Sequence, residues 1–443
     1  MKKINLLAWG IGGVCLALFV FFQAASAQES PGKKIYTLEE SIAEALENNW
    51  SLKAVDEKRN QAVNKKNQAR SDLLPRLKTQ YGYTRLDDVS NFESSLGGDY
   101  AVSSKDNYQW VSSVSQPVFA GFGLISSFRF AELGIDQAEM EMELSRLDLA
   151  LQVKEAYFNV LVMDKTVDVI EKEVAFLSSN LEVTRHFYDN GMIPVNDLLK
   201  AEMELADAVQ KQVEAKNQSN IARSVFNTIL SRPVNEPVDV TDILKYQPET
   251  VDLQENIDKA MATRPEIKLI DINLAQAEQQ VKIAASAHYP SVSLNYNFIK
   301  EGDDASVSGS PYHDADRWEV SAVCSMTLWE WGKSYYAVEE KQSAKEELIK
   351  NRHALADSIM LDVKEAKLYL DTAEKNIPTT KKAVQQGEEN LRVNEQGYRA
   401  QMNTMTEVLD AQALLTRARV NHYKALYVHN LAKATLLRAI GTY

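Results

Sequence analysis

The pattern of apolar and polar positions changes its period abruptly at Pro75. Before this proline, apolar residues recur at helical spacing through a segment that begins with Thr37 and Glu40 at capping-box spacing. After it, apolar and polar residues alternate from Leu77 to Tyr83, a period of two that predicts a strand with one apolar face. Because proline disfavours helical backbone in the residue before it, Pro75 predicts a helix-to-strand junction. The helix itself is expected to break between Asn48 and Ser51.

The same change occurs at Pro290, because the chain contains a long internal repeat. Two offsets relate the copies, 215 positions up to the first strand and 210 positions after it. The pairs include Leu38/Leu253, Pro75/Pro290, Tyr83/Phe298, Tyr108/Trp318 and Leu205/Leu415. A unit of this size is far longer than the roughly 20 to 50 residues of a solenoid repeat. The sequence therefore predicts two structural repeats, residues 28–232 and 251–443, joined by a linker at residues 233–250.

Each repeat is predicted to contain a β-hairpin. The two hairpins are expected at residues 76–119 and 291–329, with strands at Arg76–Thr84, Tyr108–Phe119, Ser291–Ile299 and Trp318–Trp329. Strands of about 9 to 11 residues can cross a bilayer when tilted, and aromatic residues gather near the ends of these strands as in a membrane girdle. An amphipathic sheet packed on helices in a soluble domain is the alternative interpretation.

Long helical segments follow each hairpin. From Leu124 to Asn190 the chain has no proline and one glycine, Gly134, and a single helix of this length would extend about 100 Å. Asn190 and Gly191 then predict a turn, after which an amphipathic segment returns from Val195 to Leu230.

The second repeat predicts the same pair of helices, at residues 333–400 and 404–439, with two departures. Pro378 lies inside the long helix and is expected to kink or break it. Gln401 stands where the first repeat has Gly191, which predicts that the second turn differs in shape.

The amino terminus has the pattern of a secretory signal. Lys2 and Lys3 precede an apolar stretch from Ile4 to Phe22, and Ala25-Ser26-Ala27 supplies a small-residue cleavage site. We therefore expect residues 1–27 to be a signal peptide and Gln28 to be the first mature residue. A retained membrane anchor is the alternative.

Composition excludes several classes of function. The formal net charge is −13, and removal of a signal containing two lysines and no acids makes it −15. Such an acidic chain, without a basic stripe, does not favour nucleic-acid binding. Cys324 is the one cysteine left after cleavage, so no intramolecular disulfide can form.

The sequence offers no constellation of catalytic residues. Metal-protease spacing, a phosphate-binding loop, a dinucleotide fingerprint and a nucleophile elbow are all missing. His422 and His429 lie seven positions apart on one predicted helix and are expected to be surface residues rather than ligands. We expect no enzyme activity, no cofactor and no metal site.

The order of these features resembles the TolC-like outer-membrane efflux proteins, also called outer membrane factors. The resemblance extends from about Tyr36 to Leu437. It is carried by both proline junctions and by the segments "YTLEESIAEALENNWSLKA", "SQPVFAGFG", "YDNGMIPVNDLLKAEMEL" and "GYRAQMNTMTEVLDAQALL".

The resemblance implies a mainly α-helical homotrimer that combines a 12-stranded β-barrel, four strands per chain, with a long helical tunnel across the periplasm. It implies residence in the outer membrane of a Gram-negative bacterium. It also implies that the chain is the exit duct of a tripartite efflux or type I secretion system, reached through a periplasmic adaptor (membrane fusion protein) by an inner-membrane transporter.

The resemblance further implies a gated entrance at the helical tip. Glu407 and Asp410 match acidic entrance positions, and they lie three apart on one helix face, so two from each of three chains would form a carboxylate ring. Asp197 and Tyr398 match positions that brace the closed entrance, and Asn403 stands where some members have arginine. For Glu407 and Asp410 the alternative is that they are solvated acids, which are favoured in the first turns of a helix.

Adaptor docking is expected at the two periplasmic turns, formed by Asn190, Gly191, Met192, Ala400, Gln401 and Met402. A rival interpretation belongs to another class of protein, a secreted periplasmic coiled-coil adaptor or structural rod with a soluble β domain. Adaptors usually have one helical hairpin, however, and lack paired β-hairpins with strands of membrane-spanning length.

Overall fold

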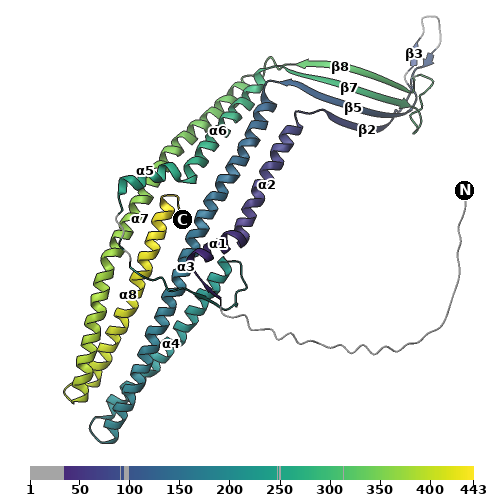
Figure 1. Cartoon of the computed structure of the whole chain (residues 1–443). Coiled ribbons are helices and arrows are strands. Elements are labelled where there is room, and N and C mark those ends of the chain that lie inside the picture. Colours follow the sequence, from purple (N-terminus) through teal and green to yellow (C-terminus); the bar gives the residue numbers. More distant parts are fainter. Residues whose placement is uncertain (1–33, 90, 94–98, 247, 249–250, 313) are drawn as a thin grey trace, which may run out of the picture.

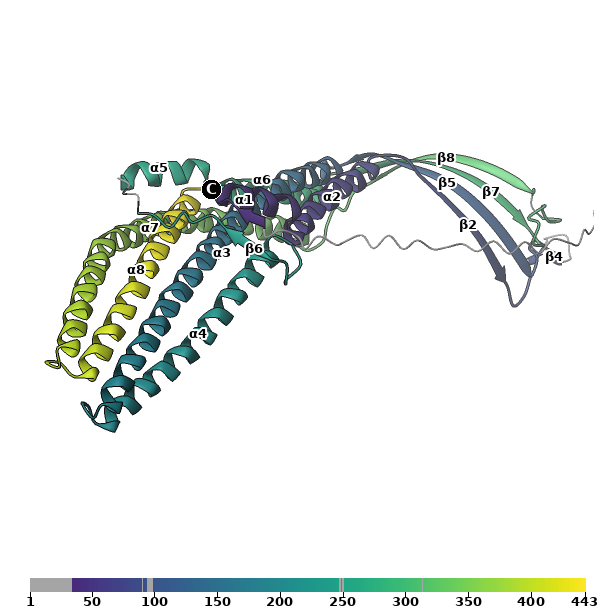
Figure 2. The same cartoon turned by 60° about the horizontal axis from the view of Figure 1, so that its bottom comes forward.

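The computed structural model describes residues 34–89, 91–93, 99–246, 248, 251–312 and 314–443. The expected signal peptide (residues 1–27) and the expected first mature residue, Gln28, lie outside the described residues. Figures 1 and 2 show an elongated molecule, with helices along most of its length and a four-stranded sheet at one end.

The first helical segment is divided in two by Asn49. Helix α1 (Leu38–Asn48) begins with a capping box, in which the Glu40 backbone N–H donates to the Thr37 hydroxyl and the Glu40 carboxylate accepts from the Thr37 N–H. Helix α2 (Trp50–Ser71) starts at Asn49, whose side chain accepts hydrogen bonds from the first N–H groups of the helix. The predicted break in this helix is therefore confirmed.

The same order of elements then occurs twice. In the first repeat α2 is followed by β2 (Arg76–Arg85), β5 (Asp106–Ala120), α3 (Gly123–Asp189) and α4 (Val195–Ile229). The second contains α5 (Leu253–Thr263), α6 (Pro265–Ala285), the short 3₁₀ helix η1 (Ser286–His288), β7 (Ser291–Gly302), β8 (Asp316–Ser325), α7 (Lys333–Arg399) and α8 (Met405–Ala439). Helices α3 and α7 each have 67 residues, and α4 and α8 each have 35. Strands begin one residue after Pro75 and after Pro290, which confirms both predicted junctions.

Left-handed backbone positions also recur at the 210-residue offset. The pairs with positive φ are Gly121/Trp331, Phe122/Gly332, Gly191/Gln401 and Ser231/Gly441. Residues other than glycine occupy this region at a cost of roughly 1–2 kcal/mol. The turns of the two repeats therefore share a backbone geometry even where only one of them has glycine.

Two small pairs of strands accompany the main elements. Strands β1 (Lys34–Tyr36) and β6 (Val238–Val240) pair in parallel, so the segment expected as a linker contributes a strand. Strands β3 (Asn91–Glu93) and β4 (Asp99–Ala101) pair antiparallel between β2 and β5.

The four long strands form one antiparallel sheet in the order β2-β5-β7-β8. The helices α2, α3, α6 and α7 continue from one end of the sheet and pack against one another in the same order (Figure 1). In both the sheet and the helical layer, the two repeats therefore lie side by side. The first repeat forms one outer edge, with β2 and α2, and the second forms the other, with β8 and α7.

In the part of the chain that the structure describes, three hydrophobic clusters hold the helices together. One joins α1, α3, α4 and the β1–β6 pair around the fully buried Tyr157, whose hydroxyl donates to the backbone oxygens of Tyr36 (3.0 Å) and Thr241 (2.8 Å). Burial raises the pKa of Tyr157 to about 12. A second joins α5, α7 and α8 in the other repeat, and a third lies near the helical tip.

One prediction about the second repeat is wrong, and of the two effects expected of Pro378, a kink or a break, the break is excluded. Strand β8 ends at Ser325 rather than Trp329, because its one partner, β7, begins at Ser291, which pairs with Ser325. Helix α7 continues through Pro378 without a break. Ile377, beside the proline, is buried in a core, and this packing offsets the roughly 3 kcal/mol that an internal proline costs.

Candidate functional site

The sheet has one apolar face and one polar face. The registers place the following residues on the same face: Leu77, Tyr81, Tyr83, Tyr108, Trp110, Val114, Val292, Leu294, Tyr296, Phe298, Trp318 and Val320. The opposite face carries Lys78, Gln80, Gln109, Ser113, Asn295, Asn297, Arg317 and Glu319. Tyr81, Leu294 and Val320 are all exposed although they are apolar. This is the arrangement expected of strands that face lipid on one side and a water-filled passage on the other.

The other end of the molecule consists of two neighbouring helical turns (Figures 1 and 2). In the first, the N–H of Gly191 donates to the Tyr188 oxygen (2.8 Å) and that of Met192 donates to the Phe187 oxygen (2.9 Å). This is a Schellman motif, with Gly191 in the left-handed position at φ 74°. Asn190 caps the helix and its side chain donates to the His186 oxygen at 2.7 Å.

The second turn repeats this hydrogen-bond pattern. The N–H of Gln401 donates to the Tyr398 oxygen (2.9 Å) and that of Met402 donates to the Gly397 oxygen (2.8 Å). Gln401 has φ 61°, so it adopts the left-handed conformation despite its side chain. The prediction that this turn differs in shape is therefore wrong. The two turns differ in backbone strain, because Gln401 adopts a left-handed conformation that glycine adopts at no cost. Met192 and Met402 are both exposed at the turns, as are Ala400 and Gln401.

Tyr398 connects the two helical hairpins. Its side chain is 4% exposed, its ring contacts Phe187 with the centroids 5.6 Å apart, and its hydroxyl lies 3.3 Å from the hydroxyl of Thr184 on α3. Burial raises the pKa of Tyr398, and the negative charge of Asp197 raises it further. A tyrosine on the second hairpin is thus bonded to the first, within a core that also contains Met405.

The other two expected bracing residues differ from Tyr398. Asp197 lies in the first turn of α4 and is close enough to Tyr398 to affect it electrostatically. Asn403 forms a local contact, because its amide donates to the Asn394 side chain (2.9 Å) and its side chain covers Gly397. In the described part of the chain no hydrogen bond joins Asp197 to Tyr398, so the two are linked by charge alone, and Asn403 takes part in the closure of its own turn.

Glu407 and Asp410 are both exposed on α8. The carboxylate of Glu407 accepts a hydrogen bond from the N–H of Thr404 at 2.8 Å, so it completes a capping box at the start of the helix. Within the described part of the chain, Asp410 has no hydrogen bond or ion pair. The two acids thus share a face, but Glu407 already has a structural role.

Three residues near the tip were missed by the sequence analysis. Thr184 bonds to Tyr398, and Lys200 on α4 donates to the Thr406 hydroxyl on α8 at 3.2 Å. A side chain on Gly397 would place its Cβ 2.6 Å from Asn403 Cγ. Of these, only Gly397 had a signal in the sequence, since it is a glycine inside a helix where the first repeat has Phe187.

The expectation that both histidines are surface residues is also wrong. His429 is 1% exposed and stacks edge-on against Tyr246, with the ring centroids 5.3 Å apart. His422 is partly buried and its Nδ1 lies 3.2 Å from the Thr380 hydroxyl. Among the residues that the structure describes, no group of acids, histidines and cysteines is arranged to hold a metal ion.

No helix in the described part of the chain is both long and apolar enough to cross a membrane.

Comparison with known proteins identifies the family that has this architecture. A model of the family described as "Outer membrane efflux protein" matches residues 41–230 and 256–442, one segment in each repeat. The outer membrane protein TolC of Vibrio cholerae is 24% identical over 430 residues, which cover 96% of this chain and 94% of the relative. The cobalt-zinc-cadmium resistance protein CzcC of Cupriavidus metallidurans is 22% identical over 412 residues, 91% of this chain and 90% of the relative.

Solved structures have the same fold. The CmeC outer membrane channel of Campylobacter jejuni superposes with a TM-score of 0.78 at 16% identity, over 91% of this chain and 85% of that one. CusC superposes with a TM-score of 0.76 at 16% identity, over 92% of both chains. The family model covers both repeats, and the structure combines a two-faced sheet with a helical shaft. The chain therefore belongs to the outer membrane efflux protein family and is an outer-membrane efflux channel of the TolC-like type.

Proposed function

We propose that three copies of this chain close their sheets head to tail into one 12-stranded barrel, continued by a helical tunnel, which is the exit duct of a tripartite efflux system. The observation that carries the proposal is the unequal pairing of equivalent strands. Among the described residues, strand β5 pairs on both sides, but its repeat equivalent β8 pairs only with β7. Strand β7 also pairs on both sides, but its equivalent β2 pairs only with β5. The open edge of β8 therefore lacks a second neighbour of the β2/β7 type, which β2 of another chain can supply. The open edge of β2 lacks a second neighbour of the β5/β8 type, which β8 of another chain can supply.

An open edge in lipid exposes unpaired backbone groups, each of which costs several kcal/mol. Pairing β8 with β2 of a partner subunit removes this cost at both edges simultaneously. It also provides a partner for residues 326–330, whose repeat equivalents in β5 pair with β7. Exposed Leu328 and Trp329 are then part of a longer strand.

The internal repeat also specifies the register between the chains. Val114 of β5 lies opposite Tyr296 of β7. The residue of β8 equivalent to Val114 is Cys324, at the repeat offset of 210. The residue of β2 equivalent to Tyr296 is Tyr81, at the repeat offset of 215. Cys324 should therefore lie opposite Tyr81 of the partner subunit.

This register can be tested with one substitution, because Cys324 is a free and exposed cysteine. Residues directly opposite in an antiparallel pair have Cα atoms about 4.5–5.5 Å apart, within the range for a disulfide. The variant Tyr81→Cys, oxidised in membranes with copper–phenanthroline, should give covalent dimers and then a closed covalent trimer on a non-reducing gel.

Two variants control for non-specific oxidation. Gln80→Cys places the new thiol on the opposite face of β2 and should not crosslink, and Tyr81→Cys with Cys324→Ser should remain monomeric on the gel. Covalent products larger than a trimer, or equal crosslinking of Gln80→Cys and Tyr81→Cys, would contradict the proposed assembly.

The tip is proposed as the periplasmic entrance, with Tyr398, Asp197 and Asn403 bracing it. Glu407 and Asp410, two from each chain, would form an acidic ring, since both are exposed on one face of α8. Such a ring concentrates cations. Replacing both acids by alanine should therefore weaken cation selectivity and block by multivalent cations in planar bilayers. If selectivity and block are unchanged, the acids are merely solvated residues of the first turns.

Outer membrane efflux proteins work in tripartite systems, and we place the adaptor contact at the two exposed turns. Their shared Schellman geometry offers an adaptor two similar sites per chain, with Gly191–Met192 in one and Gln401–Met402 in the other. The inner-membrane transporter is then reached through the adaptor. The repeats at 28–232 and 251–443, and a signal peptide ending before Gln28, belong to the same proposal.

A further inference from the structure

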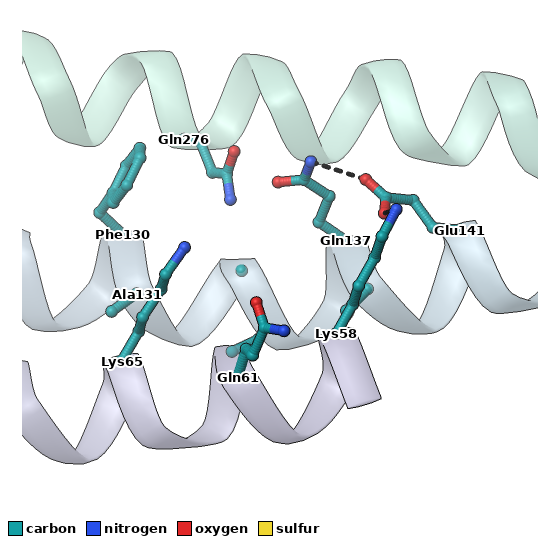
Figure 3. A pocket seen from close by; sticks show the side chains of 11 residues that line it. Lys58, Gln61, Lys65, Phe130, Ala131, Gln137, Glu141 and Gln276 are labelled. Atoms are coloured by element: carbon teal, nitrogen blue, oxygen red, sulfur yellow. Dashed lines mark hydrogen bonds and ion pairs between the residues drawn. The ribbon is translucent and has the colours of Figure 1, made fainter. Parts of the chain in front are cut away.

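A pocket of about 520 Å³ lies between α2, α3 and α6, in the helical layer that continues from the end of the sheet. Figure 3 shows side chains from all three helices around it, including Lys58, Gln61 and Lys65 from α2, Gln137 from α3 and Gln276 from α6. A volume of this size falls in the range of roughly 300–1,000 Å³ that is typical of small-molecule sites.

Small residues on α3 make the pocket possible. Ala131, Gly134 and Ala138 share one face of the helix and line the pocket as its small-residue floor. Figure 3 shows Phe130 next to Ala131 on the same helix. A Cβ atom added at Gly134 would lie 3.9 Å from the side-chain nitrogen of Gln276, an ordinary van der Waals contact, so the Gln276 amide borders the space above the glycine. The α3 side of the pocket is lined by small apolar residues, and a polar amide faces them.

The rim is polar and carries an excess of positive charge. Glu141 accepts a hydrogen bond from Gln137 (3.0 Å), and one of its oxygens lies 4.0 Å from the ammonium group of Lys58. Lys65 has no hydrogen bond or ion pair with any residue that the structure describes, and Figure 3 shows it pointing toward the space between Phe130 and Gln276. A net positive pocket is unusual in a chain with a formal charge of −13.

The internal repeat shows that the fold does not require these residues. At the repeat offsets, Lys65 corresponds to Gln280, Gly134 to Ala344 and Ala138 to Leu348. Lys58 corresponds to Asn273, and the one lysine at an equivalent lining position, Lys341, stands where the first repeat has Ala131. The second repeat thus builds the same helices with its positive charge in a different place and with larger side chains opposite Gly134 and Ala138. The placement of Lys58 and Lys65 and the small floor residues are specific to the first repeat.

We propose that this pocket binds a small organic anion, with a sulfonate or carboxylate group held by Lys65 and the neighbouring amides and with an apolar body packed over Gly134. Lysine, as a point charge, can pair with an oxyanion of either kind, and the glutamine amides supply further hydrogen-bond donors. The apolar floor limits the ligand to molecules with a ring or a short hydrocarbon portion.

The test uses naphthalene-1-sulfonate, a rigid anion, titrated calorimetrically into the mature protein in lipid nanodiscs. The wild type should bind it saturably, and neutral naphthalene-1-sulfonamide should bind at least tenfold more weakly. Lys65→Gln, which introduces the residue of the second repeat, should weaken binding about tenfold. Gly134→Leu should abolish binding by filling the floor.

The adjacent lysine provides the matched control, because Lys66 pairs with Glu132 at 2.8 Å and does not line the pocket. Lys66→Gln removes the same charge and should leave the affinity within twofold of the wild type. An equal loss in Lys65→Gln and Lys66→Gln would overturn the proposal, as would normal binding by Gly134→Leu or no saturable binding by the wild type. Unchanged oligomer mass and helicity would show that each variant is folded.

Discussion

The hydrogen bond between Tyr398 and Thr184 makes a specific prediction about gating. Tyr398→Phe removes one hydroxyl and leaves the ring in its contact with Phe187. Thr184 keeps its hydrogen bond to the Asn180 oxygen at 2.9 Å, so no buried donor is left without an acceptor. The substitution should therefore loosen the link between the two hairpins without disturbing the core.

The expected magnitude follows from the geometry. A neutral hydrogen bond contributes about 0.5–1.5 kcal/mol to stability, and this contact is long at 3.3 Å, which places it near 1 kcal/mol or below. A change of about 1 kcal/mol shifts a two-state equilibrium about fivefold. Tyr398→Phe should therefore raise the population of the open entrance up to about fivefold for each chain.

Single-channel recording in planar bilayers measures this shift directly, as a higher mean conductance or a longer open time. A double-mutant cycle with Thr184→Val tests whether the two hydroxyls act as a pair. If they do, adding Thr184→Val to Tyr398→Phe should change gating little. Tyr369→Phe is the control, because Tyr369 is an exposed tyrosine on the same helix. Unchanged gating in Tyr398→Phe, or the same increase in Tyr369→Phe, would refute the reasoning.

Three further predictions concern stability and processing. Gln401→Gly should raise the melting temperature, because relief of roughly 1–2 kcal/mol of left-handed strain exceeds the roughly 0.4–1 kcal/mol lost to glycine's freedom in the unfolded chain; a lower melting temperature would contradict this. Burial opposes ionisation of Glu266, but its hydrogen bonds with Arg264 and the charge of Arg438 lower its pKa to about 2. The folded pKa is below the unfolded value, so this stabilisation is complete above about pH 5 and is lost as the pH falls toward 2, and Glu266→Gln should flatten that part of a stability–pH curve. Mass analysis of the exported protein should give Gln28 as its first residue, and an intact Met1 terminus would remove the case for a cleaved signal.

Local patterns in the sequence were sufficient to predict the order of the elements. Capping at Thr37, the two prolines and the period-two segments are short-range signals, and each marks a boundary that the structure places within a few residues. The end of β8 was mispredicted because a strand needs a partner, and the residues after Ser325 have none within one chain. Pro378 does not break α7, because packing of the long helix exceeds a local preference.

The candidate site was less accessible to sequence reasoning. Tyr398 could be selected by its resemblance to family members, but its bond to Thr184 depends on how two distant hairpins pack. The glutamine at position 401 predicted a different turn, yet the hydrogen bonds of the Schellman motif impose the same geometry on both turns. The spacing of Thr404 and Glu407 is that of a capping box, so the structural role of Glu407 does have a signal in the sequence.

The number of chains in the assembly is the most direct test of the channel account. Native mass spectrometry of the detergent-solubilised protein, under conditions in which the four-stranded sheet is intact, measures it without further assumptions. Because β2 and β8 each lack one partner within the described chain, the sheet must close between chains, and the resemblance to TolC-like proteins sets their number at three. We therefore predict a single species containing three chains. A folded, monodisperse monomer, or a closed assembly with a different number of chains, would contradict the account.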